Sequence, residues 1–289
     1  MFDTIAVFGL GLLGGSVCRR LKRNRPGVRI RAYGRDPRRL DGALAEKLVD
    51  AAGGFGDVTL EGVDLAIVST PVDSSIEIIR GLLARPDLGP SALVIDVGSV
   101  KESIIGAVEA SGRADRYVGC HPMAGSEKMG YEFSRADLFD GASVIITPHA
   151  RNRNEDVRAV AGFWEDLGAV TTVVSPGEHD LIAAFTSHLP HMLASTLVRV
   201  FDEFRKGSGA ADLRPFIGRG FLDVTRVSSG SPDMWRDIAV HNRENLVRAL
   251  DRMIAELGAL KELIATDDPT ARAVREYLDN AKKTRDGLS

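Results

Sequence analysis

The hydrophobic positions of residues 1–175 form short runs that alternate with longer segments of helical periodicity. Several runs are apolar at every position, which is typical of strands buried on both faces of a parallel sheet. The predicted strands are Thr4–Phe8, Val28–Tyr33, Asp64–Ser69, Ala92–Asp96, Tyr117–Cys120, Ser143–Thr147 and Val170–Val174. The predicted helices between them include Leu13–Lys22, Asp73–Ala84, Lys101–Ala110 and Asn154–Leu167. This alternation predicts an α/β domain with a doubly wound sheet.

The pattern changes after the turn signal Ser175-Pro176-Gly177, and beyond it we expect helices only. Glu178–Phe204 predicts a long helix, which Pro190 should bend or break because proline lacks the N–H needed by the helical ladder. Ser231 and Pro232 are typical of a helix start, with the serine as N-cap and the proline at the first helical position.

The apolar positions after this start step mostly by three or four residues, as in one stripe of a single long helix. These positions are Ile238, Leu246, Leu250, Met253, Leu257, Leu260 and Ile264. Asp268-Pro269 predicts the opening of a last helix. A lone amphipathic helix cannot bury its stripe. We therefore predict that residues 176–289 form an all-helical domain that pairs with a second subunit in a homodimer.

Composition narrows the class of protein. The 289 residues are 44% hydrophobic and 27% charged, which suits two packed domains rather than a disordered chain. The net charge of -3 creates no general attraction to nucleic acid or to an anionic membrane. Only two cysteines are present, which favours a reducing, cytoplasmic location over a disulfide framework. We identify no apolar run of the roughly 18 residues that a membrane span needs.

Gly9-Leu10-Gly11-Leu12-Leu13-Gly14 follows a predicted strand and opens a predicted helix, which is the context in which a GxGxxG pattern binds a dinucleotide. Gly9 allows the tight turn, Gly11 lets the backbone approach the pyrophosphate, and Gly14 lets the helix pack on the strand. The free N–H groups of the helix start, at Leu12 and Leu13, would bind phosphate. The sequence thus predicts an NAD(P)-binding Rossmann domain in residues 1–175. A glycine-rich turn without a ligand is the alternative.

The choice between NAD and NADP depends on the end of the second strand. An acidic residue usually stands there and bonds the ribose of NAD, but this chain has Gly34, followed by Arg35 and Asp36. A missing carboxylate beside an arginine favours the 2′-phosphate of NADP. In the alternative, Arg35 is an ordinary solvated charge and Asp36 reaches the ribose of NAD.

Three further segments follow the ends of predicted strands, where ligands of open α/β sheets bind. Ser69, Thr70 and Pro71 follow one strand, and we expect them beside the cofactor. Ser99 follows the next strand, and His121 follows another. Removal of hydride from a carbinol carbon needs a group that takes the hydroxyl proton, and a neutral imidazole suits that role. A lone histidine is more often structural, so its position at a strand end is what favours catalysis.

Five segments together resemble the prephenate/arogenate dehydrogenase family. They are GLGLLGGS from Gly9, DVGSVK from Asp96, HPMAGSEKMG from His121, SHLPH from Ser187, and GFLDVTR from Gly220 followed by SPDMWRDI from Ser231. The segments occur in the family's order over almost the whole chain. HPMAGSEK and SHLPH are far more specific than the glycine pattern.

The resemblance implies a reaction in tyrosine biosynthesis. Hydride leaves C4 of a cyclohexadienol ring for the nicotinamide, and the ring carboxylate departs as CO2. Prephenate is the first expectation, because the chain resembles bacterial-type members, and it would give 4-hydroxyphenylpyruvate. Arogenate, which carries an amino group in place of the keto group and would give tyrosine directly, is the alternative.

The resemblance also implies roles for individual residues. His121 would hydrogen-bond the ring hydroxyl as the catalytic residue, and Ser99 would assist it. Arg226 would bind a substrate carboxylate, because a guanidinium can grip that anion bidentately. The residues implied to line the remaining pocket are His191, Ser126 and Glu127.

Each of these roles has a plainer alternative. Arg226 could be a solvated helix charge paired with Asp223. His191 could cap a helix or join two domains, and Glu127 could be a surface carboxylate.

Three other functions compete with this reading. A β-hydroxyacid dehydrogenase or imine reductase would share the architecture, but we expect a catalytic lysine on its second domain, and the helix around His188 and His191 offers none. A non-catalytic NADP sensor would need the glycine pattern without both Ser99 and His121. A zinc site is set aside, because no further cysteine or histidine joins His188 and His191 at a ligand-like spacing. No metal is therefore expected.

Overall fold

The computed structural model describes residues 2–125, 128, 130–207, 209, 212–266 and 270–288. The chain divides into two compact units, Met1–Arg243 and Glu244–Ser289, and each is described by itself. The larger unit holds the sheet, the candidate site and the first helices of the C-terminal part.

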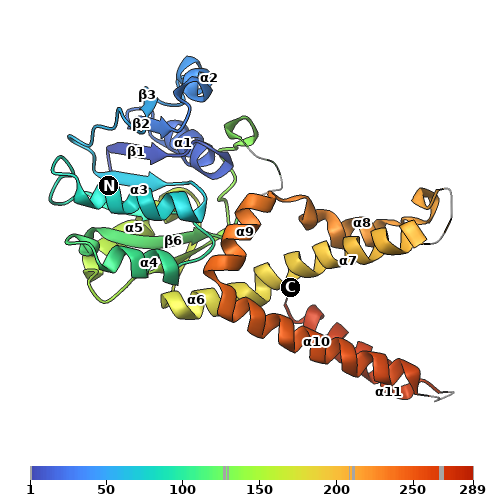
Figure 1. Ribbon diagram of the computed structural model, residues 1–289. Coiled ribbons are helices and arrows are strands. Elements are labelled where there is room, and N and C mark those ends of the chain that lie inside the picture. Colours follow the sequence, from blue (N-terminus) through green and yellow to red (C-terminus); the bar gives the residue numbers. More distant parts are fainter. Residues whose placement is uncertain are drawn as a thin grey trace. The chain divides into compact units, whose positions relative to one another are not determined.

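One sheet of eight strands forms the centre of the larger unit, with the order β3-β2-β1-β4-β5-β6-β7-β8 (Figure 1). The strands are β1 Thr4–Phe8, β2 Arg29–Gly34, β3 Ala51–Gly54, β4 Leu65–Val68, β5 Leu93–Asp96, β6 Tyr117–Pro122, β7 Ser143–Thr147 and β8 Val170–Val173. All neighbours are parallel except β6 and β7, which are antiparallel. The doubly wound sheet and the seven strands expected from the sequence are confirmed.

Two features of the sheet differ from the expectation. The strand β3 was not expected, because its sequence, Ala-Ala-Gly-Gly, has no β-branched or aromatic side chain and takes its place by pairing with the edge of β2. The strand β6 is longer than expected. It pairs with β5 through Tyr117 and Val118, and then continues alongside β7 as far as Pro122. His121 therefore lies inside a strand, opposite Ile145.

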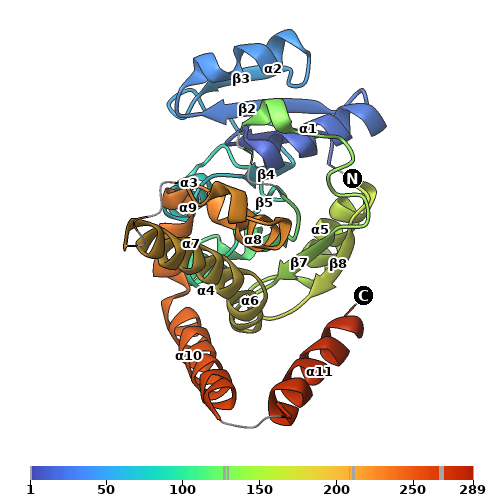
Figure 2. The same ribbon diagram turned by 90° about the vertical axis from the view of Figure 1, so that its right-hand side faces the viewer.

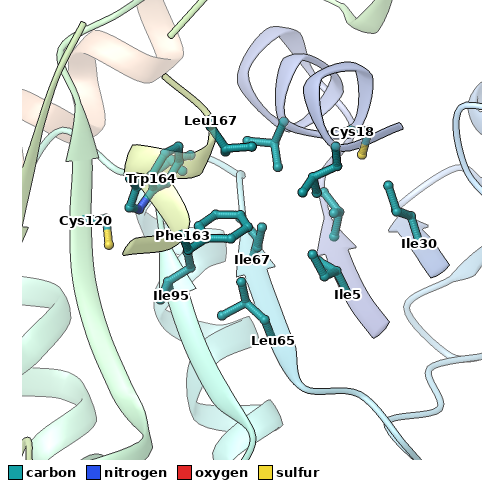
Figure 3. Close-up of a cluster of buried hydrophobic side chains, with 14 of the residues drawn as sticks. Ile5, Cys18, Ile30, Leu65, Ile67, Ile95, Cys120, Phe163, Trp164 and Leu167 are labelled. Atoms are coloured by element: carbon teal, nitrogen blue, oxygen red, sulfur yellow. The ribbon is translucent and has the colours of Figure 1, made fainter. Parts of the chain in front are cut away.

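Apolar helices cover both faces of the sheet (Figure 2). The helices of the sheet region are α1 Leu12–Asn24, α2 Asp41–Ala45, α3 Val72–Ala84, α4 Glu102–Glu109 and α5 Asn154–Asp166. On one face, α1 and α5 pack on the strands, and Figure 3 shows Cys18, Trp164 and Leu167 among Ile5 and Ile67 of the sheet. On the other face lie α3, α4 and two residues of a later helix, Trp235 and Ile238.

Both cysteines belong to the first of these layers. Cys18 and Cys120 are free and fully buried. Burial raises the pKa of each thiol to about 12, so both stay protonated and behave as small apolar groups.

The long helix expected after the sheet is present but is not uniform. It consists of α6 Pro176–Ala183, a π-helical turn at Ala184–His188, and α7 Leu189–Gly207. The break expected at Pro190 is replaced by this π turn, in which wider spacing of the backbone accommodates the proline that follows. The stretch Pro176–Gly207 is long and apolar enough to cross a membrane by composition alone, which the sequence analysis did not identify. A third of that window is buried within the protein.

Two shorter helices complete the larger unit. They are α8 Arg219–Thr225 and α9 Pro232–His241. The Oγ of Ser231 accepts from the N–H of Met234, which confirms the expected N-cap. The expectation of one long helix beyond this cap is wrong. The helix stops at Asn242, whose φ of -116° and ψ of 34° are not helical, and whose side chain bonds elsewhere in the unit.

The smaller unit contains α10 Arg243–Ala265, whose first residue closes the larger unit, and α11 Arg272–Asp286. The expected helix start at Asp268-Pro269 lies outside the described residues. Part of the predicted apolar stripe faces solvent, since Leu257 and Ile264 are exposed. No strand occurs beyond Val173 in the described parts of the chain.

Candidate active site

The glycine-rich loop between β1 and α1 has the close contacts that only glycine allows. Gly9 has a φ of +89°, and a Cβ there would lie 2.5 Å from the carbonyl oxygen of Ser69. A Cβ on Gly14 would lie 2.6 Å from the carbonyl oxygen of Gly9, so a side chain would push α1 away from the strand. The loop is therefore packed against the end of β4, as the sequence predicts for a dinucleotide-binding turn.

Gly11 differs from its two neighbours in the pattern. A Cβ there would meet nothing within 4 Å, so the space in front of this residue is open. Gly11 is also the N-cap of α1, with no side-chain cap bond and no acidic residue in the first turn. Open space beside uncapped N–H groups at a helix start fits a phosphate. The loop therefore fits the pyrophosphate of NAD(P).

At the end of β2, Gly34 leaves the expected carboxylate position without a side chain. Arg35 is exposed, and Asp36 caps the 3-10 turn Pro37–Leu40. Both oxygens of Asp36 bind the Arg38 guanidinium, at 2.9 and 3.0 Å. These hydrogen bonds hold the pKa of Asp36 below its usual value. Asp36 would have to leave Arg38 to reach a ribose.

The ends of β5 and β6 are joined by one buried carboxylate, Asp96, at the end of β5. Its oxygens accept from the N–H groups of Gly98 at 2.8 Å and Cys120 at 3.1 Å, and from the Tyr117 hydroxyl at 2.8 Å. Burial raises the pKa of Tyr117, and the carboxylate raises it further, so this hydroxyl stays a donor. Ser99 and His121 each follow a residue that Asp96 holds.

Lys101 provides the compensating charge. Its ammonium group binds Asp96 and donates to the carbonyl oxygen of Cys120 at 2.8 Å, and both charged side chains are fully buried. A buried ion pair of this kind contributes little net stability but fixes geometry, because either charge alone would be costly. Lys101 is thus a structural member of the DVGSVK segment.

His121 is 7% exposed and bonds His179 of α6, with 2.8 Å between Nδ1 of His121 and Nε2 of His179. Burial lowers the pKa of His121 well below 6.5, and the nearby His179, Lys101 and His188 lower it further. The ring is therefore neutral at physiological pH and can act as a hydrogen-bond acceptor or base.

Asp180, next to His179 on α6, binds the start of α4. Its two oxygens accept from the N–H groups of Lys101 and Glu102, at 2.8 and 2.9 Å. One of them also lies 2.7 Å from Nδ1 of His179. Asp180 is 1% exposed. The first turn of α6 is therefore joined directly to the segment that carries Ser99.

A second buried histidine, His188, lies on the same side. Its Nδ1 accepts from the Asn242 amide at 3.1 Å, and that amide also donates to the main-chain oxygen of Asp180 at 2.7 Å. Burial lowers the pKa of His188 to about 4, although Asp180 and the backbone of Ser99 act in the opposite direction. The backbone of Ser99 thus lies against His188.

Trp235 of α9 connects this group to the remaining substrate-site candidates. Its ring stacks on His191, with 3.5 Å between centroids and 11° between planes, and meets His188 edge-on at 6.1 Å. Burial lowers the pKa of His191, while a hydrogen bond to the backbone of Val227 raises it. Arg226, the neighbour of Val227, opens the exposed 3-10 turn Arg226–Ser229.

The structure therefore gathers most of the residues expected from the sequence. Contacts run from His121 through α6 to the backbone of Ser99, and from His188 through Trp235 to the turn of Arg226. Ser126 and Glu127 lie outside the described residues.

Comparisons with known proteins agree with this architecture. The sequence model described as "Prephenate dehydrogenase, nucleotide-binding domain" matches residues 17–173, and "Prephenate dehydrogenase, dimerization domain" matches residues 175–280. Prephenate dehydrogenase of Bacillus subtilis (strain 168) is 33% identical over 296 aligned positions, which cover 100% of this chain and 76% of that protein. The chain belongs to the prephenate dehydrogenase family.

Further relatives in this family differ in the substrate that their names give. Cyclohexadienyl dehydrogenase of Zymomonas mobilis is 33% identical, over 99% of this chain and 96% of that protein. The Aquifex aeolicus prephenate dehydrogenase solved with hydroxyphenyl propionate and NAD+ is 32% identical and superposes with a TM-score of 0.90, covering 100% of this chain and 99% of that one. Synechocystis arogenate dehydrogenase is 26% identical with a TM-score of 0.78, covering 99% and 100%.

Several residues of the candidate active site were not expected from the sequence. The buried partners His179, Asp180, Trp235 and Asn242 are the main ones. His179 and Asp180 stand side by side at the start of a predicted helix, where charged residues are ordinary surface features. Their only signal in the sequence is a histidine beside an aspartate, soon after the turn Ser175-Pro176-Gly177.

Proposed function

We propose that the protein catalyses the oxidative decarboxylation of prephenate to 4-hydroxyphenylpyruvate, with hydride transfer to NAD(P), in tyrosine biosynthesis. The observation that carries the proposal is a buried, neutral histidine, His121, in β6, which lies two strands from β4, the strand whose end contacts the dinucleotide loop. The relatives named for prephenate and cyclohexadienyl substrates support the choice of ring.

In the proposed mechanism, His121 binds the hydroxyl on C4 of the ring. When bound at the glycine-rich loop, NAD(P)+ would supply the acceptor for the hydride that leaves C4. Positive charge develops on the hydroxyl oxygen as that bond breaks, and the lone pair of the neutral imidazole stabilises it by accepting the O–H. The bond between C1 and its carboxylate then breaks, CO2 leaves, and the electron pair completes the aromatic ring. The result is a phenol, with no net proton released.

The other expected residues would position the substrate. Arg226 would bind a carboxylate bidentately, and Ser99 would bond the hydroxyl beside His121. His191, held flat against Trp235, would present one ring edge to the substrate. The residues proposed to complete the pocket are Ser126 and Glu127.

The first test of this function is nicotinamide reduction by the purified protein in four combinations, prephenate or arogenate with NAD or NADP. Turnover of prephenate supports the proposal, and turnover of arogenate alone would move the assignment to that substrate. In a second test, His121→Asn should abolish most turnover while cofactor binding, followed by nicotinamide fluorescence, is retained. Unchanged turnover in that variant would contradict the mechanism.

We also propose a preference for NADP over NAD. Support comes from the missing carboxylate at Gly34, the exposed Arg35, and the engagement of Asp36 with Arg38. Arg35→Ala should raise the KM for NADP about tenfold, the effect of losing one charge-assisted hydrogen bond, and leave the KM for NAD unchanged. Arg158→Ala, on the exposed face of α5, is the matched control. An equal effect on both cofactors would contradict the preference.

The organisation of the chain is proposed in the same way. We propose a cofactor domain of residues 1–175 and a substrate-binding and dimerisation domain of residues 176–289, with a cytoplasmic location. The family description of residues 175–280 as a dimerization domain supports a homodimer. So do exposed apolar side chains on the C-terminal helices, among them Leu197, Val200, Phe204, Leu222, Val224, Ile254, Leu257 and Ile264. Light scattering would measure the mass of the protein in solution. A monomer at micromolar concentration would contradict the homodimer.

A further inference from the structure

Three buried side chains form a row that ends at His121. The carboxylate of Asp180 lies 2.7 Å from Nδ1 of His179, and Nε2 of His179 lies 2.8 Å from Nδ1 of His121. The three residues are 1%, 3% and 7% exposed, so water does not compete for these bonds. The two imidazole rings meet edge-on, at 69° between planes. His121 comes from β6, whereas its two partners come from α6.

The direction of each hydrogen bond follows from the Asp180 end of the row. Its carboxylate already accepts from the main-chain N–H groups of Lys101 and Glu102, so it offers only lone pairs to its neighbours. Nδ1 of His179 must therefore carry a proton and donate. In a neutral ring, the other nitrogen of His179 then has a lone pair and accepts.

A neutral His179 therefore presents an acceptor to Nδ1 of His121, and in this arrangement Nδ1 of His121 carries the proton. Because burial keeps its ring neutral by lowering its pKa, Nε2 of His121 is left with the lone pair. That nitrogen is the one not engaged by His179, so it is the atom that can accept from a substrate hydroxyl.

We propose that His179 and Asp180 are positioning residues that fix His121 as its Nδ1–H tautomer and so keep Nε2 available as the acceptor for the substrate hydroxyl. An isolated neutral histidine does not favour this tautomer, so the protein must impose it. The inference rests on the proposed role of His121. It adds that the helical part of the chain sets the protonation pattern of a residue in the sheet.

The tautomer can be measured without turnover, by 15N NMR of the full-length protein labelled at histidine and saturated with NADP. The signals of His121 are identified by their absence in His121→Gln. We expect Nδ1 of His121 to be the protonated nitrogen and Nε2 the bare one at neutral pH. A proton on Nε2 of His121 in the wild-type protein would overturn the proposal.

Two substitutions of His179 separate positioning from simple packing. The amide of His179→Gln reaches about as far as Nε2 and can accept from His121, whereas His179→Phe keeps a ring but has no acceptor. We expect kcat to fall about 10²-fold in His179→Phe, the usual contribution of one acid–base group, with the NADP dissociation constant unchanged. His179→Gln should recover most of that loss and keep the wild-type NMR pattern.

The control is His241→Phe, because His241 lies on α9 and pairs with Asp73 away from this row. Its kcat should match the wild type. Equal losses of kcat in His179→Phe and His179→Gln would overturn the positioning role. If the wild-type protein showed the expected tautomer but turned over neither prephenate nor arogenate, the proposed function would fail while the tautomer assignment stood.

Discussion

Two buried carboxylates organise the two sides of the site, and they are compensated in different ways. Asp96, at the end of β5, is fully buried against the ammonium of Lys101 and accepts from two main-chain N–H groups. Asp180, on α6, is as deeply buried and also accepts from two main-chain N–H groups, but its side-chain partner is the imidazole of His179. On the sheet, the charge of Lys101 holds Asp96 in place. On α6, the imidazole of His179 connects Asp180 to His121.

The largest loss of unfolding free energy should come from breaking the ion pair between Asp96 and Lys101. Asp96→Asn leaves the Lys101 ammonium buried without its counter-charge, which should cost about 3–5 kcal/mol of unfolding free energy. Urea unfolding followed by circular dichroism would measure the loss. The double variant Asp96→Asn with Lys101→Met should recover much of it, because no charge then remains buried. A loss below about 1 kcal/mol in the single variant would show that the pair does not lock this region.

The second largest effect on the unfolding free energy should come from acid, through His188 on the helical side of the site. The pKa of His188 is about 4 in the folded protein because of burial, but near 6.5 when unfolded. Above pH 6.5 neither state is protonated. As the pH falls from 6.5 to 4, only the unfolded state takes up the proton, so stability should decline by about 3 kcal/mol and then level off. His121, whose pKa burial also lowers, contributes in the same direction.

The measurement is the urea midpoint as a function of pH. His188→Gln should show a shallower decline than the wild type, whereas His241→Gln, altered at the protein surface, should keep it. An unfolding free energy that stays constant from pH 6.5 to 4 would contradict the buried neutral state.

Breaking the second carboxylate should affect stability less than breaking the first. Asp180→Asn keeps an acceptor for α4 and leaves no buried cation, so we expect a loss of about 1–2 kcal/mol. Turnover should fall more than stability suggests, because an amide can donate to His179 and reverse its tautomer. Comparison of kcat with the urea midpoint in the same preparation tests this. A fall in stability as large as that of Asp96→Asn would remove the difference between the two carboxylates.

The smallest effect is expected at the surface. Asp73 on α3 lies 2.6 Å from Nε2 of His241 on α9, and this pair is solvent-accessible. Asp73→Asn should lower the unfolding free energy by about 0.5 kcal/mol, since exposed ion pairs contribute little. A loss above about 2 kcal/mol would mean that this contact, and not the buried row, joins α9 to the sheet domain.

The same contrast explains what the sequence could predict. Strands such as Thr4–Phe8 are apolar throughout and are buried by helices on both faces, so local pattern and final environment agree. The glycine loop and His121 were found because strand ends have a known place in such sheets. The end of the helix at Asn242 was missed, because the apolar stripe continues through it and the cause is a hydrogen bond to His188. The partner of His121 was missed for the same reason, since it lies 58 positions away.

The place of His121 within the β6–β7 ladder has a consequence for how the enzyme can change. Its main chain is held by strand pairing opposite Ile145, so the base cannot drift with loop motion. Arg226, in contrast, stands on a short exposed turn after α8. If Arg226 and His121 have the proposed roles, substitutions on that turn would change recognition of the substrate and leave His121 in place. Related enzymes with this fold could therefore change from a keto acid to an amino acid substrate while the residues that act on the ring stay the same.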